Sequence, residues 1–102
     1  LIPVEEEIYY TYHVTNEKNL PFILENGIIP QENFKSLNKG YFKLVFASKN
    51  YDKLWYNGVG DIVIKIKADD YMWYKDTNLY KLNWSVCTPN KILPSDIVDV
   101  IN

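Results

Sequence analysis

His13 and Thr15 are the residues whose types and spacing most readily suggest chemistry. His13 is the only histidine in the 102-residue chain, and imidazole is the side chain that titrates nearest neutral pH. The Tyr, Val and Thr residues around it predict a strand over residues 8–15. Such a strand would place His13 and Thr15 on one face, toward a cleft, and Tyr12 and Val14 on the other, packed inward or against the next strand. The alternative interpretation is a structural histidine bonded to a backbone carbonyl.

Other reactive side chains carry weaker signals. The single cysteine, Cys87, excludes an internal disulfide and a zinc site built from cysteines. No base lies near it in the sequence, so we expect a buried apolar residue. Asp69 and Asp70 are adjacent and would point to opposite faces of a strand, which favours solvated turn carboxylates. A metal site made of two histidines is also excluded within one chain.

Composition predicts one globular domain over residues 1–102, and because the chain begins at Leu1 rather than Met we expect a trimmed N-terminus. Hydrophobic residues make up 47% and charged residues 24%. No apolar run approaches the roughly 20 residues of a membrane span, and Glu5 to Glu7 stand where a signal peptide would be basic. One cysteine then favours a reducing, intracellular compartment, with the cytoplasm as the expected location.

Charge and aromatic content bear on the partners. All eleven basic residues are Lys and the net charge is −2. Arg is the usual bidentate reader of phosphate and guanine, so its absence argues against a module that reads nucleic-acid sequence. Nine Tyr, four Phe and three Trp suggest a surface that stacks flat ligands or partners. We therefore expect a protein rather than a nucleic acid as the macromolecular partner.

Helical signals are short. Asn19 is a plausible N-cap with Pro21 in the first turn, and Asn26-Gly27 is a stop signal. The apolar stripe of this helix comprises Leu20, Ile23 and Leu24. We expect it to be buried against one side of a strand over residues 62–67, the side formed by Ile62, Ile64 and Ile66. A second short helix is expected after Ser48 or Asn50, carrying Tyr51, Leu54 and Trp55.

Further strands are expected over 42–47, 84–88 and 97–101, with a short strand or turn over 71–74. Strands combined with two short helices make the fold class α+β.

The chain resembles proteins of the ADP-ribosyltransferase fold along nearly its whole length, in short pieces. The most specific piece is Tyr12-His13-Val14-Thr15 followed by Asn19-Leu20-Pro21, Ile23-Leu24 and Gly27-Ile28-Ile29-Pro30. Leu44 to Ser48, Gly60 to Ile66 and Ile92 to Ile97 are similar to later core strands and their approaches. The DNA-targeting ADP-ribosyltransferase toxins are most similar, followed by the RNA 2′-phosphotransferases and the poly(ADP-ribose) polymerases. The likeness to toxins implies, as an alternative location, delivery into the cytosol of a host cell. The resemblance implies a compact split β-sheet with two short helices.

The resemblance also implies a chemistry and a set of residues. NAD would be the substrate, cleaved between nicotinamide and ribose through an oxocarbenium-like transition state, with transfer of ADP-ribose to a macromolecular target. His13 would bond the adenine-side ribose with support from Thr15. The other residues assigned to NAD binding would be Tyr12, Phe46, Ser48, Tyr51 and Tyr56. Asn83 falls where the family carries the glutamate that stabilises the positive charge, so His13 and Asn83 are the catalytic candidates.

Two departures from the family keep an alternative open. Asn83 is neutral, and the Arg of the toxins and phosphotransferases is absent from the chain. The alternative is a degenerate, non-catalytic member that binds a nucleotide or another protein. An RNA enzyme similar to the 2′-phosphotransferases is the least favoured interpretation, because it would need that Arg.

Overall fold

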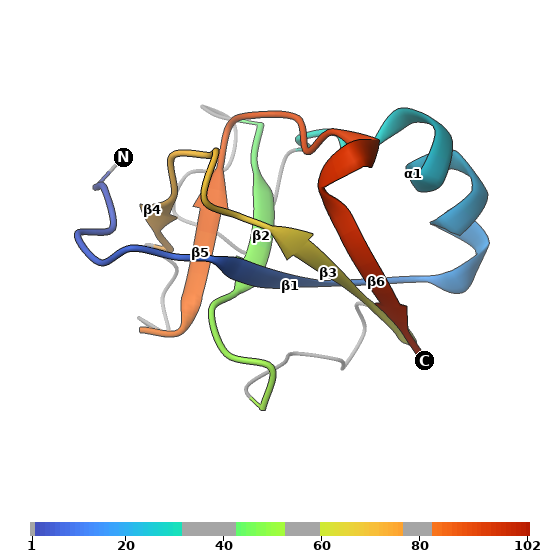
Figure 1. Cartoon of the computed structure of the whole chain (residues 1–102), viewed down its shortest axis with the longest axis horizontal. Helices are drawn as coiled ribbons and strands as arrows, with labels where there is room; N and C mark the ends of the chain where they lie inside the picture. Colours follow the sequence, from blue (N-terminus) through green and yellow to red (C-terminus); the bar gives the residue numbers. More distant parts are fainter. Residues whose placement is uncertain (1, 32–42, 53–59, 77–82) are drawn as a thin grey trace.

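Six strands form one antiparallel sheet in the computed structural model, which describes residues 2–31, 43–52, 60–76 and 83–102 (Figure 1). The sheet order is β4-β5-β2-β1-β3-β6. The elements in chain order are β1 (Tyr10–Thr15), the 3-10 helix η1 (Glu17–Asn19), α1 (Leu20–Asn26), β2 (Val45–Ser48), β3 (Ile62–Lys67), β4 (Tyr74–Lys75), β5 (Ser85–Thr88), the 3-10 helix η2 (Pro94–Asp96) and β6 (Ile97–Ile101). One sheet and one short α-helix confirm the α+β class.

The sheet consists of two three-stranded halves that meet at a narrow joint. β1 and β3 align over six consecutive pairs, from Tyr10 opposite Lys67 to Thr15 opposite Ile62. β1 and β2 align at one pair only, Tyr12 opposite Ser48. The described strands thus form one sheet rather than the split sheet that the resemblance implied. We call the contact between its two halves the β1–β2 joint.

The helix signals are confirmed in position, while one capping detail differs. α1 begins after Asn19 and ends at Gly27, whose φ of 85° lies in the left-handed region that favours glycine. A Cβ at Gly27 would lie 2.0 Å from the carbonyl oxygen of Ile92, so this position also allows α1 to approach the segment before η2. The Asn19 side chain does not cap α1 and donates instead to Thr15 Oγ1 at 3.2 Å.

The prediction that Leu24 is buried is wrong. Ile23 is 6% exposed and Leu24 51% exposed. Successive residues on a helix are about 100° apart, and the seven-residue α1 turns Ile23 toward the core and its neighbour toward solvent. Leu20 is partly buried against the same core. The strand side of the prediction is confirmed, since Ile62, Ile64 and Ile66 are all buried.

The hydrophobic core lies on one face of the sheet. Ile64 and Ile66 of β3 contribute to it, together with Ile23, Ile28, Val45, Ala47, Ala68, Trp73, Val86 and Ile92. Residues directly opposite on neighbouring strands point to the same face. His13 is opposite Ile64, so its side chain belongs to the core face, whereas Tyr12 and Ser48 belong to the opposite face.

Strand bounds agree closely with expectation where alternation is clear. β3 and β6 have the predicted bounds, while β1, β2 and β5 differ by one to three residues. The predicted short strand or turn at 71–74 is a bend followed by β4. Most of the predicted second helix lies outside the described residues; Tyr51, within them, is in a turn. Within the described part of the chain, no helix is long and apolar enough to cross a membrane.

Candidate functional site

A hydrogen bond from His13 crosses the β1–β2 joint. His13 Nδ1 lies 2.6 Å from the carbonyl oxygen of Phe46 in β2. A carbonyl oxygen only accepts, so Nδ1 carries the hydrogen and donates. The ring thereby links two strands that share a single register pair. The structural alternative predicted a bond of this type, and it is present.

The same bond determines what the other ring nitrogen can do. Burial lowers the pKa of His13 from its usual 6.5, and the bond to Phe46 offsets this only in part. The imidazole is therefore neutral at pH 7, with an unshared electron pair on Nε2. Among the described residues, no group donates to Nε2. His13 can therefore accept a hydrogen bond from a ligand hydroxyl while Nδ1 holds the ring in place.

Two tyrosines pack together beside the joint on the opposite face. The rings of Tyr12 and Tyr51 meet edge to face with centroids 5.4 Å apart. Ser48 holds the turn that carries Tyr51, because its Oγ donates to the Asn50 carbonyl at 2.7 Å and accepts from the Asn50 N–H at 3.0 Å. Tyr51 remains half exposed after this contact. The turn after β2 thus presents an aromatic surface.

The predicted site residues therefore do not share one face of the sheet. His13 and Thr15 lie on the core face, and Tyr12 and Ser48 on the opposite one. They come together only at the β1–β2 joint, where His13 and Tyr12 of β1 lie next to Phe46 and Ser48 of β2.

Three predicted site residues lie elsewhere or have other contacts. Thr15 is buried; its hydroxyl oxygen accepts from Asn19, and its backbone lies against Gly60, where a Cβ would come within 2.1 Å. Asn83 occupies an exposed turn just before β5. Tyr56 falls outside the described residues. Thr15 therefore anchors the end of β1, and no contact in the described structure ties Asn83 to His13.

Several carboxylates form ion pairs or hydrogen bonds with residues other than His13. Asp69 and Asp70 pair with Lys67 at 3.2 and 3.4 Å in an exposed turn, as the sequence predicted. Asp76 was not singled out from the sequence, yet it is only 8% exposed and accepts from Ser85 Oγ at 2.7 Å. Ser85 is the register partner of Ser48, which brings Asp76 to the β5 side of the joint. No sequence signal marked this pair, because it depends on the register of three strands.

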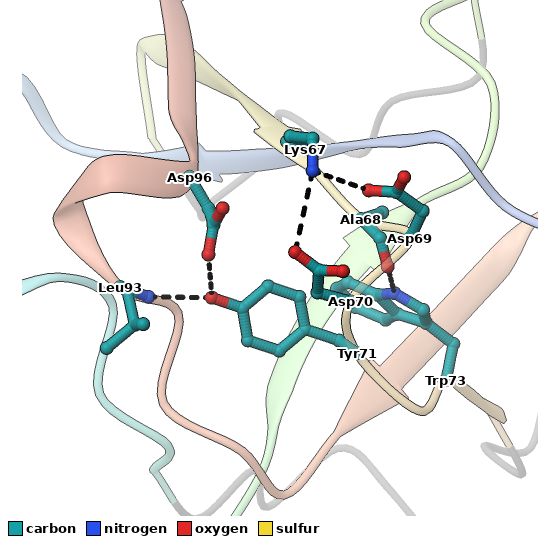
Figure 2. A network of polar contacts seen from close by, with 8 residues as sticks. All are labelled: Lys67, Ala68, Asp69, Asp70, Tyr71, Trp73, Leu93 and Asp96. Carbon is teal, nitrogen blue, oxygen red and sulfur yellow. Dashed lines mark hydrogen bonds and ion pairs between the residues drawn. The ribbon is translucent and has the colours of Figure 1, made fainter.

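A second polar network fixes the connection between β3 and β4, as Figure 2 shows. The Tyr71 hydroxyl donates to Asp96 at 2.5 Å and accepts from the Leu93 N–H at 2.9 Å. Burial and the bond to Asp96 raise the pKa of Tyr71. Trp73 Nε1 donates to the Ala68 carbonyl at 2.9 Å in the same turn. This network attaches the turn to η2 and is structural in character.

The buried-cysteine interpretation is confirmed. Cys87 is fully buried, and burial, with a smaller contribution from Asp76, raises its pKa to about 12. The thiolate is the nucleophilic form, so Cys87 remains a thiol at neutral pH. Nucleophilic catalysis by this side chain is thereby disfavoured.

The chain has no match among known protein-family models, and no curated protein matches it significantly. Within the described ranges, no cluster of three or more His, Cys, Asp or Glu side chains could hold a metal ion. The interpretation of the site therefore depends on the geometry at the β1–β2 joint. That geometry offers a neutral hydrogen-bond acceptor, a tyrosine pair and buried hydroxyl groups.

Proposed function

We propose that this chain is an ADP-ribosyltransferase-like protein that binds NAD or a related nucleotide at the β1–β2 joint. The observation that carries the proposal is the bond from His13 Nδ1 to the Phe46 carbonyl. It leaves a neutral Nε2 as an oriented acceptor, and the hydroxyl groups of a ribose are donors of the matching kind. The resemblance of the segment from Tyr12 to Pro30 to the family supports the same ligand.

The aromatic residues supply the second part of a nucleotide site. Tyr12 and Tyr51 present ring edges and faces beside the joint, and Phe46 is only partly buried. Adenine and nicotinamide are flat rings that stack on such surfaces. A nucleotide would then place a sugar hydroxyl at His13 and a ring against the tyrosine pair.

A second candidate is binding without turnover, which the position of Asn83 favours. This residue is neutral and lies in an exposed turn, and Asp69, Asp70 and Asp96 are engaged with Lys67 or Tyr71. A preorganised group that stabilises developing charge contributes about 3–4 kcal/mol to catalysis. With no carboxylate of the described residues in contact with His13, the protein would bind the nucleotide far better than it cleaves it.

Calorimetric titration with NAD and with ADP-ribose tests binding. His13→Asn retains a donor for the Phe46 carbonyl and removes Nε2, so we expect it to fold and to bind at least about fivefold more weakly, the effect of one lost hydrogen bond. Tyr51→Leu should also weaken binding, whereas Tyr9→Leu, a matched change at another exposed tyrosine, should not. Unchanged affinity in His13→Asn would contradict the proposed site.

Release of nicotinamide separates the two candidates. If the protein only binds, the wild type releases little nicotinamide from NAD, and Asn83→Glu increases the rate because it adds a negative charge. Rapid release by the wild type would instead establish a transferase or glycohydrolase and point to another carboxylate, with Asp76 the first to replace. A protein substrate is the macromolecular target we expect, and radiolabelled NAD would identify it.

A further inference from the structure

The two edge strands of the sheet differ in whether another segment pairs with their outer side. The outer side of β4 is covered by the N-terminal segment, where Pro3 is bridged to Tyr74 and the Lys75 N–H donates to the Ile2 carbonyl at 2.7 Å. β6 lies at the opposite edge (Figure 1), and among the described residues no strand pairs with its outer side. An open edge is a template for another strand. β6 is therefore the edge at which this sheet can be extended.

One backbone amide on that edge is occupied by a side chain. The bond from the Ala68 N–H to the Tyr9 carbonyl sets the alternation of the β1–β3 ladder, so Ile64 directs its backbone groups toward β1. Val100 is opposite Ile64 and consequently directs its N–H away from β3. The Asp99 carboxylate accepts this N–H at 2.8 Å. Asp99 thus blocks the outward amide that a new strand would need.

The carboxylate of Asp99 has no cation of its own. Lys65 is its register partner on β3, but the Lys65 ammonium lies over the Tyr10 ring, 4.4 Å from its centre. Among the described residues, no lysine forms an ion pair with Asp99. A strand that displaces this carboxylate from the Val100 amide would therefore release an unpaired negative charge at the centre of the new ladder.

We propose that the outer edge of β6 binds an extended peptide strand that carries a basic residue opposite Asp99, and that it rejects a second copy of this chain. The new ladder would form its hydrogen bonds at Val100. Asp99 is paired with Lys65 and directs its backbone groups toward β3, which puts it at a non-hydrogen-bonded position of the new ladder, where facing side chains are closest. The register shift between Lys65 and Ile66 leaves Val98 without a register partner on β3. A Lys or Arg there compensates the released charge. The four apolar residues of β6 are all β-branched, and Val98 is 52% exposed, which suits strand pairing.

The sequence of β6 explains why a second copy is rejected. Residues 97–101 read Ile-Val-Asp-Val-Ile, which is the same in both directions. Antiparallel pairing of two copies about a two-fold axis, in the register that aligns all five residues of β6, would place Asp99 opposite Asp99. Like charges directly opposite destabilise a ladder, so the residue that attracts a basic strand also opposes self-association.

Two seven-residue peptides of alternating Thr and Val, one with Lys and one with Asp at the centre, test the proposal in an NMR titration of the whole chain. The Lys peptide should shift the Val98 and Val100 amides and protect Val100 from solvent exchange. The Asp peptide should bind at least about tenfold more weakly, the sum of a lost attraction and a gained repulsion. Asp99→Lys should reverse this preference, while Asp52→Lys, the same charge change at an exposed turn, should leave it unchanged.

Sedimentation equilibrium of the wild type completes the test, with a monomer expected. Equal affinity for the two peptides, shifts that avoid β6, or a wild-type dimer protected at Val100 would each overturn the proposal. Failure here would leave nucleotide binding at the β1–β2 joint intact, because that site is on other strands. Asp99 is exposed, so the variants are expected to fold, which their amide spectra will show.

Discussion

The central strand β1 is joined to its two neighbours in different ways. Toward β3 the ladder is continuous over six pairs, and the partner residues Ile62, Ile64 and Ile66 are buried. Toward β2 there is one backbone pair, and the His13 side chain provides a further link to Phe46. The first joint depends on packing and the second on a polar side chain. The weaker joint is where we propose that a ligand binds.

The largest expected effect lies at the stronger joint. Ile64→Ala removes a fully buried side chain and should lower the free energy of unfolding by about 2–5 kcal/mol, the usual range for such a cavity. Urea denaturation measures it. Leu24→Ala, at an exposed helix position, is the control and should change stability by less than about 0.5 kcal/mol. Similar losses in the two variants would show that the packing assigned to β3 is wrong.

At the weaker joint, His13→Ala leaves the Phe46 carbonyl without its donor and should cost about 1–2 kcal/mol. His13→Asn can place an amide N–H near the position of Nδ1 and should therefore lose less. Denaturant unfolding of both variants gives the difference. If they are equally destabilised, His13 contributes through ring packing and the bond to Phe46 has little weight.

Acidification should weaken the same joint selectively. The pKa of His13 is below its usual 6.5 in the folded protein because burial disfavours the charged ring. The unfolded chain therefore binds the proton more readily, so this contribution is complete above pH 6.5 and is lost as the pH falls below it. Unfolding measured between pH 8 and 5 should show the wild type losing stability relative to His13→Asn. A constant difference across this range would contradict the burial of the ring.

The smallest effect is expected at Thr11, next to His13 on the core face. Its side chain is fully buried, and its hydroxyl oxygen has no hydrogen-bond partner among the described residues. Replacing an unsatisfied buried hydroxyl by a methyl group of similar shape is nearly neutral or stabilising. Thr11→Val should therefore raise the melting temperature slightly or leave it unchanged. A clear loss of stability would reveal a partner for this hydroxyl.

Local sequence patterns were sufficient to predict elements that follow a clear alternation or end at a clear stop signal. The alternation over residues 62–67 predicted the bounds of β3, and Asn26-Gly27 predicted the end of α1. The same kind of reasoning failed at Leu24, because three apolar residues at helical spacing do not say how far round a short helix the core extends. Burial at one position depends on what packs against it, which the local pattern does not contain.

The candidate site was less predictable because it depends on register. Strand alternation correctly placed His13 and Thr15 on one face and Tyr12 on the other, but it could not show that Ser48 shares the face of Tyr12 or that the face of His13 is the core face. The Asp76–Ser85 bond and the network around Tyr71 join residues from separate elements. Such contacts follow from the strand order, which nothing in the local sequence specifies.

The strand order also has a kinetic consequence. β1 pairs with β3, the N-terminal segment pairs with β4, and β6 pairs with β3 at the other edge. Nearly every pairing joins residues far apart in the sequence, and chains dominated by non-local pairings fold slowly because loops must close before contacts form. The bridge between Pro3 and Tyr74 spans most of the chain. We therefore expect folding on the millisecond-to-second timescale, with closure of the β4 edge among its latest steps.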